Sequence, residues 1–462
     1  MDLNFDQKNI ALILPELPRE QLEGLVLQQA TLIEQLQTRV SELEKQLEEL
    51  HQQPPTSTAP FRRDKNRLSK NRKKSGQKKG HQGFFRLPPP PTEIIDVPLD
   101  YCPDCFSHIE HLRHHTQTIE ELPIIIPQVI QIKTQSGYCK NCRKKVRSSH
   151  PLQISKAQGA ASTALGPQAK AVAIELQHRF HLTKSKTCAI LKEFFGINLT
   201  RGGLVNLSHR VAARLQPKYH QLQLQVQQSS HIHADETGWY VGASGHQLCV
   251  FTNRWLTFYQ ITESRTRELV KRILGANYKG VLITDCLSIY DEVNRLQQKC
   301  YAHHFRSIKA ALEKISGGVS DYLEEIKLLL QTAMTLKSLQ AELKTVELAA
   351  RIQHLETWAA NLLRLENRPA QLQPEEETIR RRLFKQRDHL FEFLKHREVE
   401  ATNNQAERQL RPAVIARKLS CGNRTAKGAK TWEVLASLSV TTKQRNESFK
   451  DLIAQSIFGV PP

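Results

Sequence analysis

The feature that most constrains the fold is a series of strand-like segments beginning with HIHADETGWYV, residues 231–241. Apolar and polar side chains alternate along it, as in a half-buried strand, and Asp235 and Glu236 come where we expect this strand to end. HQLCVFTNR and LTFYQITES alternate in the same way, and the glycine-rich GASGH between the first two segments predicts a hairpin turn. The sequence therefore predicts three consecutive antiparallel strands.

A helix and two more strands are predicted after these three. RTRELVKRILG indicates a basic helix, GVLITD is an apolar run typical of a buried strand ending at Asp285, and KCYAHHF predicts a fifth strand. This order of elements is that of the RNase H-like α/β fold, in which the first and fourth strands are neighbours. Asp235 and Asp285 would then face each other. Along the first strand His231, His233 and Asp235 share one face, whereas Glu236, the alternative first ligand, points the other way.

A third acid is predicted on a helix that follows residues 309–398, a helix-rich stretch that we interpret as a helical insertion. In EATNNQAERQLRPAV, Asn403, Glu407 and Arg411 lie at i, i+4 and i+8 on one stripe, with Arg408 beside them. The proline after Arg411 predicts a helix end or a kink. An ordinary ion pair between Glu407 and Arg411 is the alternative, but two acids already placed at strand ends favour a site.

The three acids predict metal-dependent chemistry. Clustered carboxylates repel one another, so at least one would have a raised pKa unless cations were present. Two Mg²⁺ ions about 3.5 to 4 Å apart would remove that penalty, activate a water or a DNA 3′-hydroxyl and stabilise the leaving oxygen. Oxygen ligands suit Mg²⁺, with Mn²⁺ as the alternative. Asp235, Asp285 and Glu407 are therefore the predicted catalytic residues and metal ligands.

The charge balance predicts a polyanionic partner. Lys and Arg outnumber Asp and Glu by 66 to 46 in 462 residues, a net charge of +20. Half of this excess lies in FRRDKNRLSKNRKKSGQKKGHQGFFR, residues 61–86, which contains eleven Lys or Arg and one Asp. We expect this segment to be disordered when free and to bind DNA phosphates, with a solvated tail as the alternative. Its candidate contacts are Lys73, Lys74, Lys78 and Lys79.

Four of the nine cysteines form two CxxC pairs, CPDC and CKNC. They are Cys102, Cys105, Cys139 and Cys142. Each pair can present two thiolates to one tetrahedral Zn²⁺, and the strand-like stretch between the pairs predicts a zinc-ribbon-like module with one structural ion. Such a module could place Lys144, Lys145 and Arg147 against DNA.

Residues 19–50 predict a coiled coil of four heptads, which favours a parallel dimer. Position a is mostly β-branched and position d is mostly leucine. The a positions are Val26, Ile33, Val40 and Leu47, and the d positions are Leu22, Gln29, Leu36, Leu43 and Leu50. A single amphipathic helix packed on its own domain is the alternative.

Changes in composition and motif divide the chain into seven predicted parts. They are an N-terminal helix or coiled coil (1–52), a basic linker that acts as a DNA-phosphate arm (53–92), a zinc-binding module (93–152), a helical segment with helix-turn-helix-like spacing (153–225), the first part of the catalytic core (226–308), the helical insertion (309–398) and the second part of the core with the C-terminal helices (399–462). Plain helix packing is the alternative for the helix-turn-helix-like segment. No stretch approaches 18 apolar residues and the first ten residues are acidic, so we expect a soluble cytoplasmic protein.

At these residues the sequence resembles the IS66 family of bacterial insertion-sequence transposases, which are DDE enzymes. The similarity covers most of the chain beyond the heptads. It includes GQKKGHQG, both CxxC pairs, HADETGW, GVLITDCLSIYD, CYAHHFR, TNNQAERQLRP, RKLSCGN and GAKTWEVLASLSVTTKQRNESFKDLI. The resemblance implies an RNase H-like core interrupted by a helical insertion, with Asp235, Asp285 and Glu407 as the metal-binding triad. It also implies cleavage at transposon ends and joining of the 3′-hydroxyls to target DNA.

The chain departs from the family pattern beside two of these motifs. Cys286 follows Asp285 where the family commonly has glycine, and YAHHFRSI replaces a more basic segment. Cys300 and His303 have the CxxH spacing that similar transposases use near the scissile phosphate, with a core cysteine beside a hydrogen-bonded histidine as the alternative. The candidate phosphate contacts near the acids are His303, Asn403, Arg408 and Arg411.

The expected partner is double-stranded DNA, at the terminal repeats of the transposon and at the target. A homodimer or larger assembly on DNA and accessory proteins encoded by the transposon are further expected partners, in the bacterial cytoplasm and associated with the nucleoid. Two other functions stay open. One is a DNA-binding regulator or domesticated transposase with an inactive core, and the other is an RNase H-type nuclease without strand transfer.

Overall fold

The computed structural model describes residues 33, 35–42, 89–122, 125–150, 153, 164–315, 318–364 and 372–458. They fall into two compact units, divided after Thr118, and each unit is described by itself. In the first unit residues 35–42 are helical, and the heptad side chains Ile33, Leu36 and Val40 are exposed. The coiled coil stays a prediction. Outside the described residues lie the other heptad positions and the candidate DNA contacts Lys73, Lys74, Lys78 and Lys79.

Each CxxC pair lies in a tight turn. In the first unit the backbone N–H of Phe106 donates to the carbonyl of Cys102 at 2.9 Å. In the second unit β1 (Ser136–Cys139) and β2 (Lys144–Arg147) form a hairpin that carries the other pair. The strand-like alternation before this hairpin does not give a longer strand, and five apolar side chains between residues 122 and 130 are exposed. A strand needs a neighbour on which to bury its apolar face, and none is described for this stretch.

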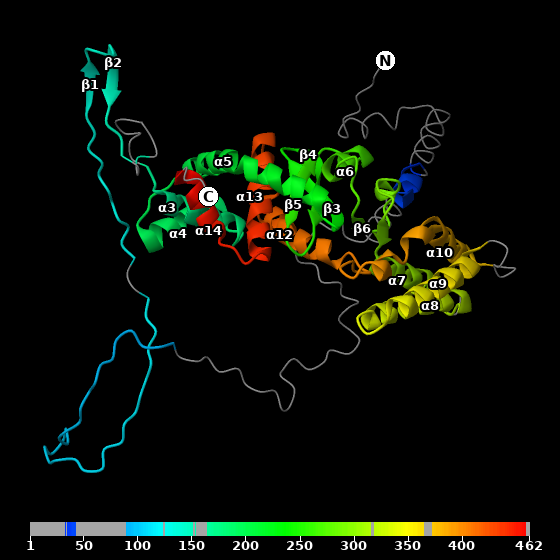
Figure 1. Ribbon diagram of the computed structural model, residues 1–462, viewed down its shortest axis with the longest axis horizontal. Helices are drawn as coiled ribbons and strands as arrows, with labels where there is room; N and C mark the ends of the chain where they lie inside the picture. Colours follow the sequence, from blue (N-terminus) through cyan, green and yellow to red (C-terminus); the bar gives the residue numbers. More distant parts are fainter. Residues whose placement is uncertain are drawn as a thin grey trace, which may run out of the picture. The chain divides into compact units, whose positions relative to one another are not determined.

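The second unit contains a five-stranded mixed sheet in the order β5-β4-β3-β6-β7 (Figure 1). Its strands are β3 (His231–Val241), β4 (Ser244–Thr252), β5 (Thr257–Thr262), β6 (Val281–Thr284) and β7 (Gln297–Lys299). β3, β4 and β5 pair antiparallel, whereas β6 pairs parallel with both β3 and β7. The hairpin between β3 and β4 turns at Gly242, whose φ of +63° suits glycine. The predicted mixed α/β class, the three-stranded meander and the adjacency of the first and fourth strands are confirmed.

Two strand predictions are wrong in extent. β3 does not end at Asp235 and Glu236, because it continues to Val241 and buries Trp239. Both acids therefore lie in the middle of a strand. The segment YAHHF is helical, since α7 (Tyr301–Leu312) begins there and its buried residues recur at intervals of three and four.

One helix packs across the face of the sheet that carries Trp239. This helix, α12 (Asn404–Ser420), buries Ala406, Leu410 and Ala413 over β3 and β4. Of the two outcomes predicted at Pro412, the helix end is wrong, because α12 continues for two further turns, and the kink stays a prediction. Proline removes one backbone hydrogen bond, but burial of Ala413 and the contacts of Arg417 hold the following turns against the sheet.

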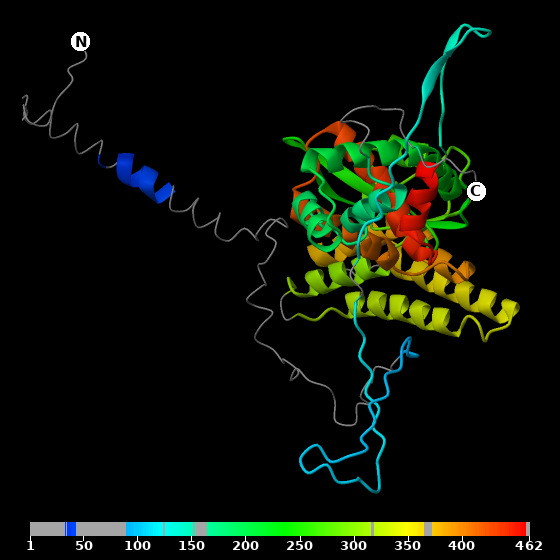
Figure 2. The ribbon, with the colours of Figure 1, turned by 90° about the vertical axis from the view of Figure 1, so that its left-hand side faces the viewer.

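The helices after α7 form a region with its own core. They are α8 (Asp321–Leu339), α9 (Thr345–Leu363), α10 (Pro374–Lys385) and the short α11 (Glu392–Lys395). Their buried leucines and isoleucines pack together and onto Val281 and Ile283 of β6. Figure 2 shows α8 and α9 side by side below the sheet. This agrees with a helix-rich stretch after the fifth strand, whereas the exact domain boundaries stay predictions.

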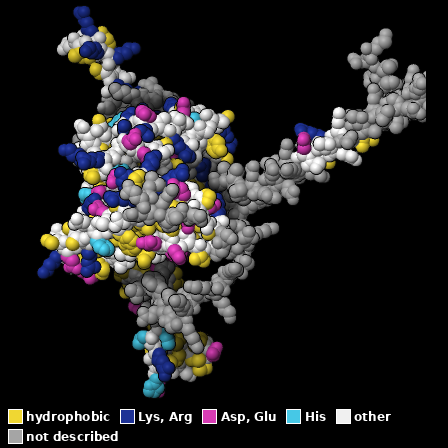
Figure 3. Space-filling model, turned by 90° about the vertical axis from the view of Figure 1, so that its right-hand side faces the viewer, with side chains coloured by type: hydrophobic (Ala, Val, Ile, Leu, Met, Phe, Trp, Pro, Cys, Tyr) yellow, Lys and Arg dark blue, Asp and Glu magenta, His cyan; other side chains and the backbone are white. Residues whose placement is uncertain are grey.

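Charges on this helical region are largely paired. Lys327 and Glu324 lie 2.8 Å apart on α8, and Arg351 and Glu347 lie 2.7 Å apart on α9. Lys395 contacts Glu356 at 3.0 Å, which links two helices. On the face drawn in Figure 3, basic and acidic side chains lie among one another.

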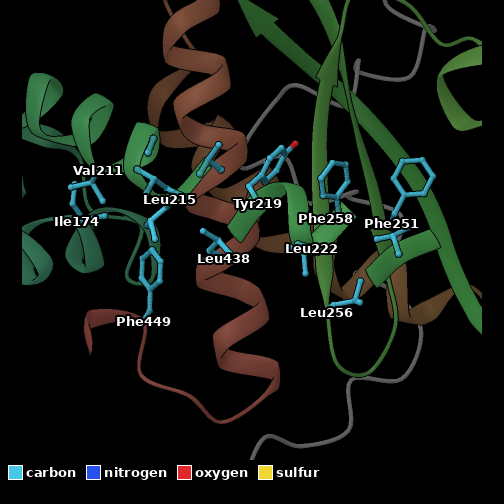
Figure 4. Packing of buried hydrophobic residues seen from close by; sticks show 14 of the residues in the cluster. Ile174, Val211, Leu215, Tyr219, Leu222, Phe251, Leu256, Phe258, Leu438 and Phe449 are labelled. Carbon is cyan, nitrogen blue, oxygen red and sulfur yellow. The ribbon is translucent and has the colours of Figure 1, made fainter. Parts of the chain in front are cut away.

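The opposite face of the sheet is covered by α5 (Arg201–Gln228) and α6 (Arg267–Leu274). This core continues into α3 (Pro167–His178), α13 (Ala426–Gln444) and α14 (Phe449–Phe458). Figure 4 shows the cluster, in which Tyr219 of α5 stacks on Phe258 of β5 with ring centroids 4.7 Å apart.

The helix-turn-helix-like pair consists of α4 (Lys184–Phe195) and α5. Gly196, with φ of +62°, ends α4, and the Thr200 hydroxyl caps α5 by accepting from the N–H of Gly203 at 3.0 Å. Since α5 is 28 residues long and buries nine of them, most of it serves the core. Reading of DNA by this pair stays a prediction. None of the described helices is both long and apolar enough to span a membrane.

Candidate active site

The register of the parallel strands brings the first two acids level. His231 pairs with Val281 and His233 with Ile283, an offset of fifty residues. Continuing that register by two places puts Asp285, just beyond the end of β6, opposite Asp235 on β3. In parallel strands residues in register point to the same face, so both carboxyls are directed to the α12 side of the sheet.

Asn403 fixes the start of α12 beside these strands. Its side-chain amide donates to the carbonyl of Ala234 at 2.9 Å, and its oxygen lies 3.2 Å from Nδ1 of His233. Its backbone N–H donates to Sγ of Cys300 at 3.1 Å. Glu407, one turn later, is thereby held near Asp235. Asn403 is fully buried, which is at odds with the predicted phosphate contact and assigns it to positioning.

Asp235 lacks a basic partner. Its Oδ1 accepts from the backbone N–H of Glu236 at 2.8 Å, and no Lys or Arg forms an ion pair with it among the described residues. The pKa of Asp235 is raised to about 7, mainly by burial and also by the charges of Glu236, Asp285 and Glu407, which together outweigh the lowering effect of that hydrogen bond. Asp285 and Glu407 are therefore close enough to act electrostatically on Asp235.

Glu236 has partners of its own on the opposite face. The Tyr290 hydroxyl donates to its Oε2 at 2.5 Å, and Arg265 lies 3.5 Å from its Oε1. Burial raises the pKa of Glu236, while Tyr290 and Arg265 act to lower it. Because Glu236 is already bound by a phenol and a guanidinium on the opposite face, it is a poor candidate for the metal ligand on the α12 side.

Glu407 pairs with a residue that the sequence analysis missed. Its Oε1 lies 3.2 Å from Nη2 of Arg306, whose guanidinium also contacts the ring of His303 at 3.3 Å. Burial and then Arg306 lower the pKa of His303, whereas Asp285 and Glu407 raise it. His303 therefore lies in the field of the acids. The i,i+3 spacing of His303 and Arg306 on a helix could have indicated their contact with each other, but not the ion pair of Arg306 with Glu407.

Comparison with known families decides the class. The model of the Transposase IS66 family matches residues 162–431, more than half of the chain. The chain belongs to the IS66 transposase family. The match includes Asp235, Asp285 and Glu407 and leaves out both CxxC pairs. No curated protein matches the transposase.

Family membership makes the protein a transposase of the DDE type, which implies DNA as its partner and a divalent metal ion. The described residues contain no group of three or more His, Cys, Asp or Glu that could hold a metal ion as they stand. In this arrangement Glu407 is paired with Arg306. The oxygen donors, and the cation deficit around Asp235, fit a hard divalent ion.

The loop after Asp285 shows how the transposase satisfies half-buried acids with its own backbone N–H groups and lysines. Oδ1 of Asp285 accepts from the N–H of Leu287 at 3.0 Å, which shapes the turn. At the end of this loop Asp291 lies 3.4 Å from Lys299 and 2.7 Å from Lys385. Burial alone would raise the pKa of Asp291, but the bond from Lys385 and the charge of Lys299 outweigh it and lower this pKa.

The remaining predicted site residues lie in two settings. Arg408 and Arg411 are exposed on α12, and Arg408 donates to Oε1 of Gln405 at 2.8 Å. Cys300 is fully buried, and burial raises the pKa of its thiol. This environment favours the core-cysteine interpretation of the CxxH spacing.

The thiols within each CxxC pair interact. Hydrogen bonds with Ser107 and with Cys102 lower the pKa of Cys105. Hydrogen bonds with the backbone and thiol of Cys142 lower the pKa of Cys139. Each turn thus contains one thiol whose pKa is lowered, and a thiolate is the donor that Zn²⁺ prefers.

Proposed function

We propose that this transposase has an RNase H-like catalytic core, cuts DNA at transposon ends and joins the 3′-hydroxyls to target DNA. The observation that carries the proposal is Asp235, a half-buried carboxyl whose pKa is raised to about 7 beside two other acids and without a basic partner among the described residues. Burying an unpaired acid is costly, and such acids are concentrated at functional sites.

Asp235, Asp285 and Glu407 are the residues that would hold the divalent ions. When bound, a pair of such ions activates the attacking oxygen and stabilises the leaving oxygen of an in-line displacement at phosphorus. Glu407 joins this set by leaving Arg306, to which it is bound by a half-exposed ion pair worth at most about 1 kcal/mol. Arg306 is then free to bind a DNA phosphate.

The protein's own contribution is positioning and charge. Asn403 keeps Glu407 beside β3, and the turn at Leu287 keeps the Asp285 carboxyl in place. Arg408 and Arg411 bind the DNA backbone next to the acids, because guanidinium groups match phosphate in a bidentate geometry. His303 contacts Arg306, is acted on by the charges of Asp285 and Glu407, and is a further candidate contact to the scissile phosphate.

The test is Mg²⁺-dependent nicking of a labelled DNA duplex taken from the ends of the element that encodes this gene. The wild type is compared with Asp285→Asn and with Asp388→Asn, a matched control at an exposed aspartate of the helical region. We expect nicking by the wild type and the control and none by Asp285→Asn. Equal nicking by all three proteins would refute the catalytic assignment.

Two outcomes separate the alternatives. A nuclease without strand transfer would nick the ends but fail to join pre-cleaved 3′-hydroxyl ends to a target plasmid. A DNA-binding regulator with an inactive core would bind the same duplex and produce neither product. The transposase is expected to give both products.

We further propose that Cys102, Cys105, Cys139 and Cys142 hold one structural Zn²⁺. Each pair supplies two thiols, and four thiolates complete a tetrahedral site. Cys139→Ser should lower the zinc content measured by mass spectrometry, whereas Cys421→Ser, an exposed cysteine outside the pairs, should not. Full zinc occupancy in Cys139→Ser would exclude the site.

Self-association through the heptads is a separate proposal. Deletion of residues 1–52 should convert a dimer or larger assembly into monomers, measured by light scattering. An unchanged mass would assign assembly to another surface. Accessory proteins of the transposon stay an expectation from the family.

A further inference from the structure

The sequence that follows Glu407 carries charge of one sign. From residue 408 to residue 432 there are seven Lys or Arg and no Asp or Glu. Most of this stretch is α12 and the start of α13. On α8 and α9, by contrast, basic residues pair with acids of the same helix.

The packing of α12 sorts these residues onto two sides. Ala406, Leu410 and Ala413 face the sheet. Arg417 also turns inward, since its Nη1 donates to Oγ1 of Thr237 at 3.2 Å and to the carbonyl of Gly238. The opposite side is exposed at positions spaced by three and four residues, which form one line along the helix. We name it the α12 stripe, and it consists of Arg408, Arg411, Ile415, Lys418 and Leu419.

The basic members of the α12 stripe have no acidic partner in the part of the chain that the structure describes. Arg408 contacts only an amide, on Gln405. Arg411 and Lys418 form no ion pair among the described residues. Like charges at helical neighbours repel, which costs a few tenths of a kcal/mol for each pair. A polyanion would remove this repulsion.

The dimensions of the α12 stripe suit a nucleic acid duplex. Ten residues separate Arg408 from Lys418, about 15 Å along a helix that rises 1.5 Å per residue. That length covers about four base-pair steps of 3.4 Å. The stripe begins one residue after Glu407, so DNA reacting at the acids would pass along it.

We propose that the α12 stripe binds the phosphate backbone of duplex DNA on one side of the cleavage point. This rests on the proposed function, and it extends the contact with DNA from the acids to the far end of α12. Lys418, two turns beyond the predicted contact Arg411, marks that end. Ile415, which is 47% exposed, lies between Arg411 and Lys418, and Leu419, which is 52% exposed, follows Lys418. Both would face the sugar edges.

A test of binding without catalysis separates the two proposals. The full-length protein is titrated with a fluorescein-labelled 30-base-pair duplex in EDTA, and anisotropy is recorded from low to high salt. Arg411→Gln with Lys418→Gln should weaken binding and reduce the slope of log affinity against log salt by about 2, because each lost phosphate contact removes about 0.9. The matched control is Lys271→Gln with Arg272→Gln, two exposed residues of α6 on the other face of the sheet, and it should keep the slope.

The outcomes are distinguishable. Equal slopes for the stripe variant, the control and the wild type would overturn the stripe, while nicking that still depends on Asp285 would leave the proposed function standing. If the wild type failed to nick DNA while the stripe variant still showed the reduced salt slope, the proposed function would be contradicted and the stripe proposal would stand. Ile415→Ser with Leu419→Ser should change DNA affinity less than twofold. If Ile415→Ser with Leu419→Ser were the only variant to lose binding, the α12 stripe would be a surface for a protein partner and the proposal would fail. Thermal melting checks that each variant folds.

Discussion

Asp235 and Asp291 are two carboxyls of the same α/β unit in opposite electrostatic settings. Asp291 has two lysines within ion-pair distance, one of them fully buried, and its pKa is lowered. Asp235 has none, lies beside other acids, and has a pKa raised to about 7. The lysines around Asp291 stabilise the folded chain, whereas the raised pKa of Asp235 destabilises it once this carboxyl ionises. An acid that the fold leaves unsatisfied indicates that its partner comes from outside the chain.

The largest effect is expected from Asp235→Asn on activity. The amide keeps the size of the side chain and still accepts the N–H of Glu236, but it lacks the charge that holds a cation. Nicking of end-derived DNA should fall by at least about 1,000-fold, which corresponds to about 4 kcal/mol of transition-state stabilisation. If the variant nicked within tenfold of the wild type, Asp235 would be no more functional than Asp291.

The opposite result is expected for Asp291→Asn. Removing this charge leaves Lys299 buried without its counter-ion, and breaking such a pair costs about 3 to 5 kcal/mol of unfolding free energy. Urea denaturation measures the loss. Glu292→Gln is the neighbouring control, since its carboxylate is 80% exposed and pairs only with Arg267. A loss below about 1 kcal/mol for Asp291→Asn would remove the contrast.

The pH dependence of stability sharpens the comparison further. The folded pKa of Asp235 lies above the ordinary value of 3.8, so between about pH 4 and pH 7 the unfolded chain ionises first. The contribution of Asp235 to the unfolding free energy is therefore present at low pH, falls as pH rises to about 7 and is then constant. Asp235→Asn should abolish that fall and be more stable above pH 7, by on the order of 2 to 4 kcal/mol without divalent cations. A difference between the two proteins that is independent of pH would contradict this assignment.

The smallest effect on stability is expected from breaking the ion pair between Glu407 and Arg306, because both side chains are partly exposed. Arg306→Gln should lower the unfolding free energy by less than about 1 kcal/mol, because exposed ion pairs contribute little. It should also tighten Mn²⁺ binding, measured by calorimetry, since Glu407 no longer has to leave Arg306. Lys309→Gln, whose partner Glu313 is also exposed, is the control and should leave Mn²⁺ affinity unchanged. Weaker Mn²⁺ binding by Arg306→Gln would mean that this ion pair supports the site.

Local patterns predicted the elements that carry the acids. Alternation located β3, β4 and β5, and the apolar run before Asp285 located β6, because these signals depend only on which side of a strand is buried. The end of β3 was misplaced. Two adjacent acids look like a turn, and the burial of Trp239 depends on packing against Trp432, nearly two hundred residues later.

Long-range pairing was beyond the sequence patterns. Nothing in the spacing indicates that Lys385 meets Asp291, or that Arg306 meets Glu407, because each of these two pairs joins segments far apart in the chain. The prediction that the helix ends before Pro412 was wrong for a similar reason. The proline rule is local, whereas the burial of Ala413 that continues α12 comes from the sheet.

The central claim is that Asp235 gives up a proton when a divalent ion binds. Calorimetric titration with Mg²⁺ at pH 6, in two buffers that differ in ionisation enthalpy, measures the protons released on binding. We predict release of roughly one proton by the wild type, since a group with a pKa near 7 must deprotonate to become a ligand, and almost none by Asp235→Asn. Equal proton release by the two proteins, or none by the wild type, would contradict the account.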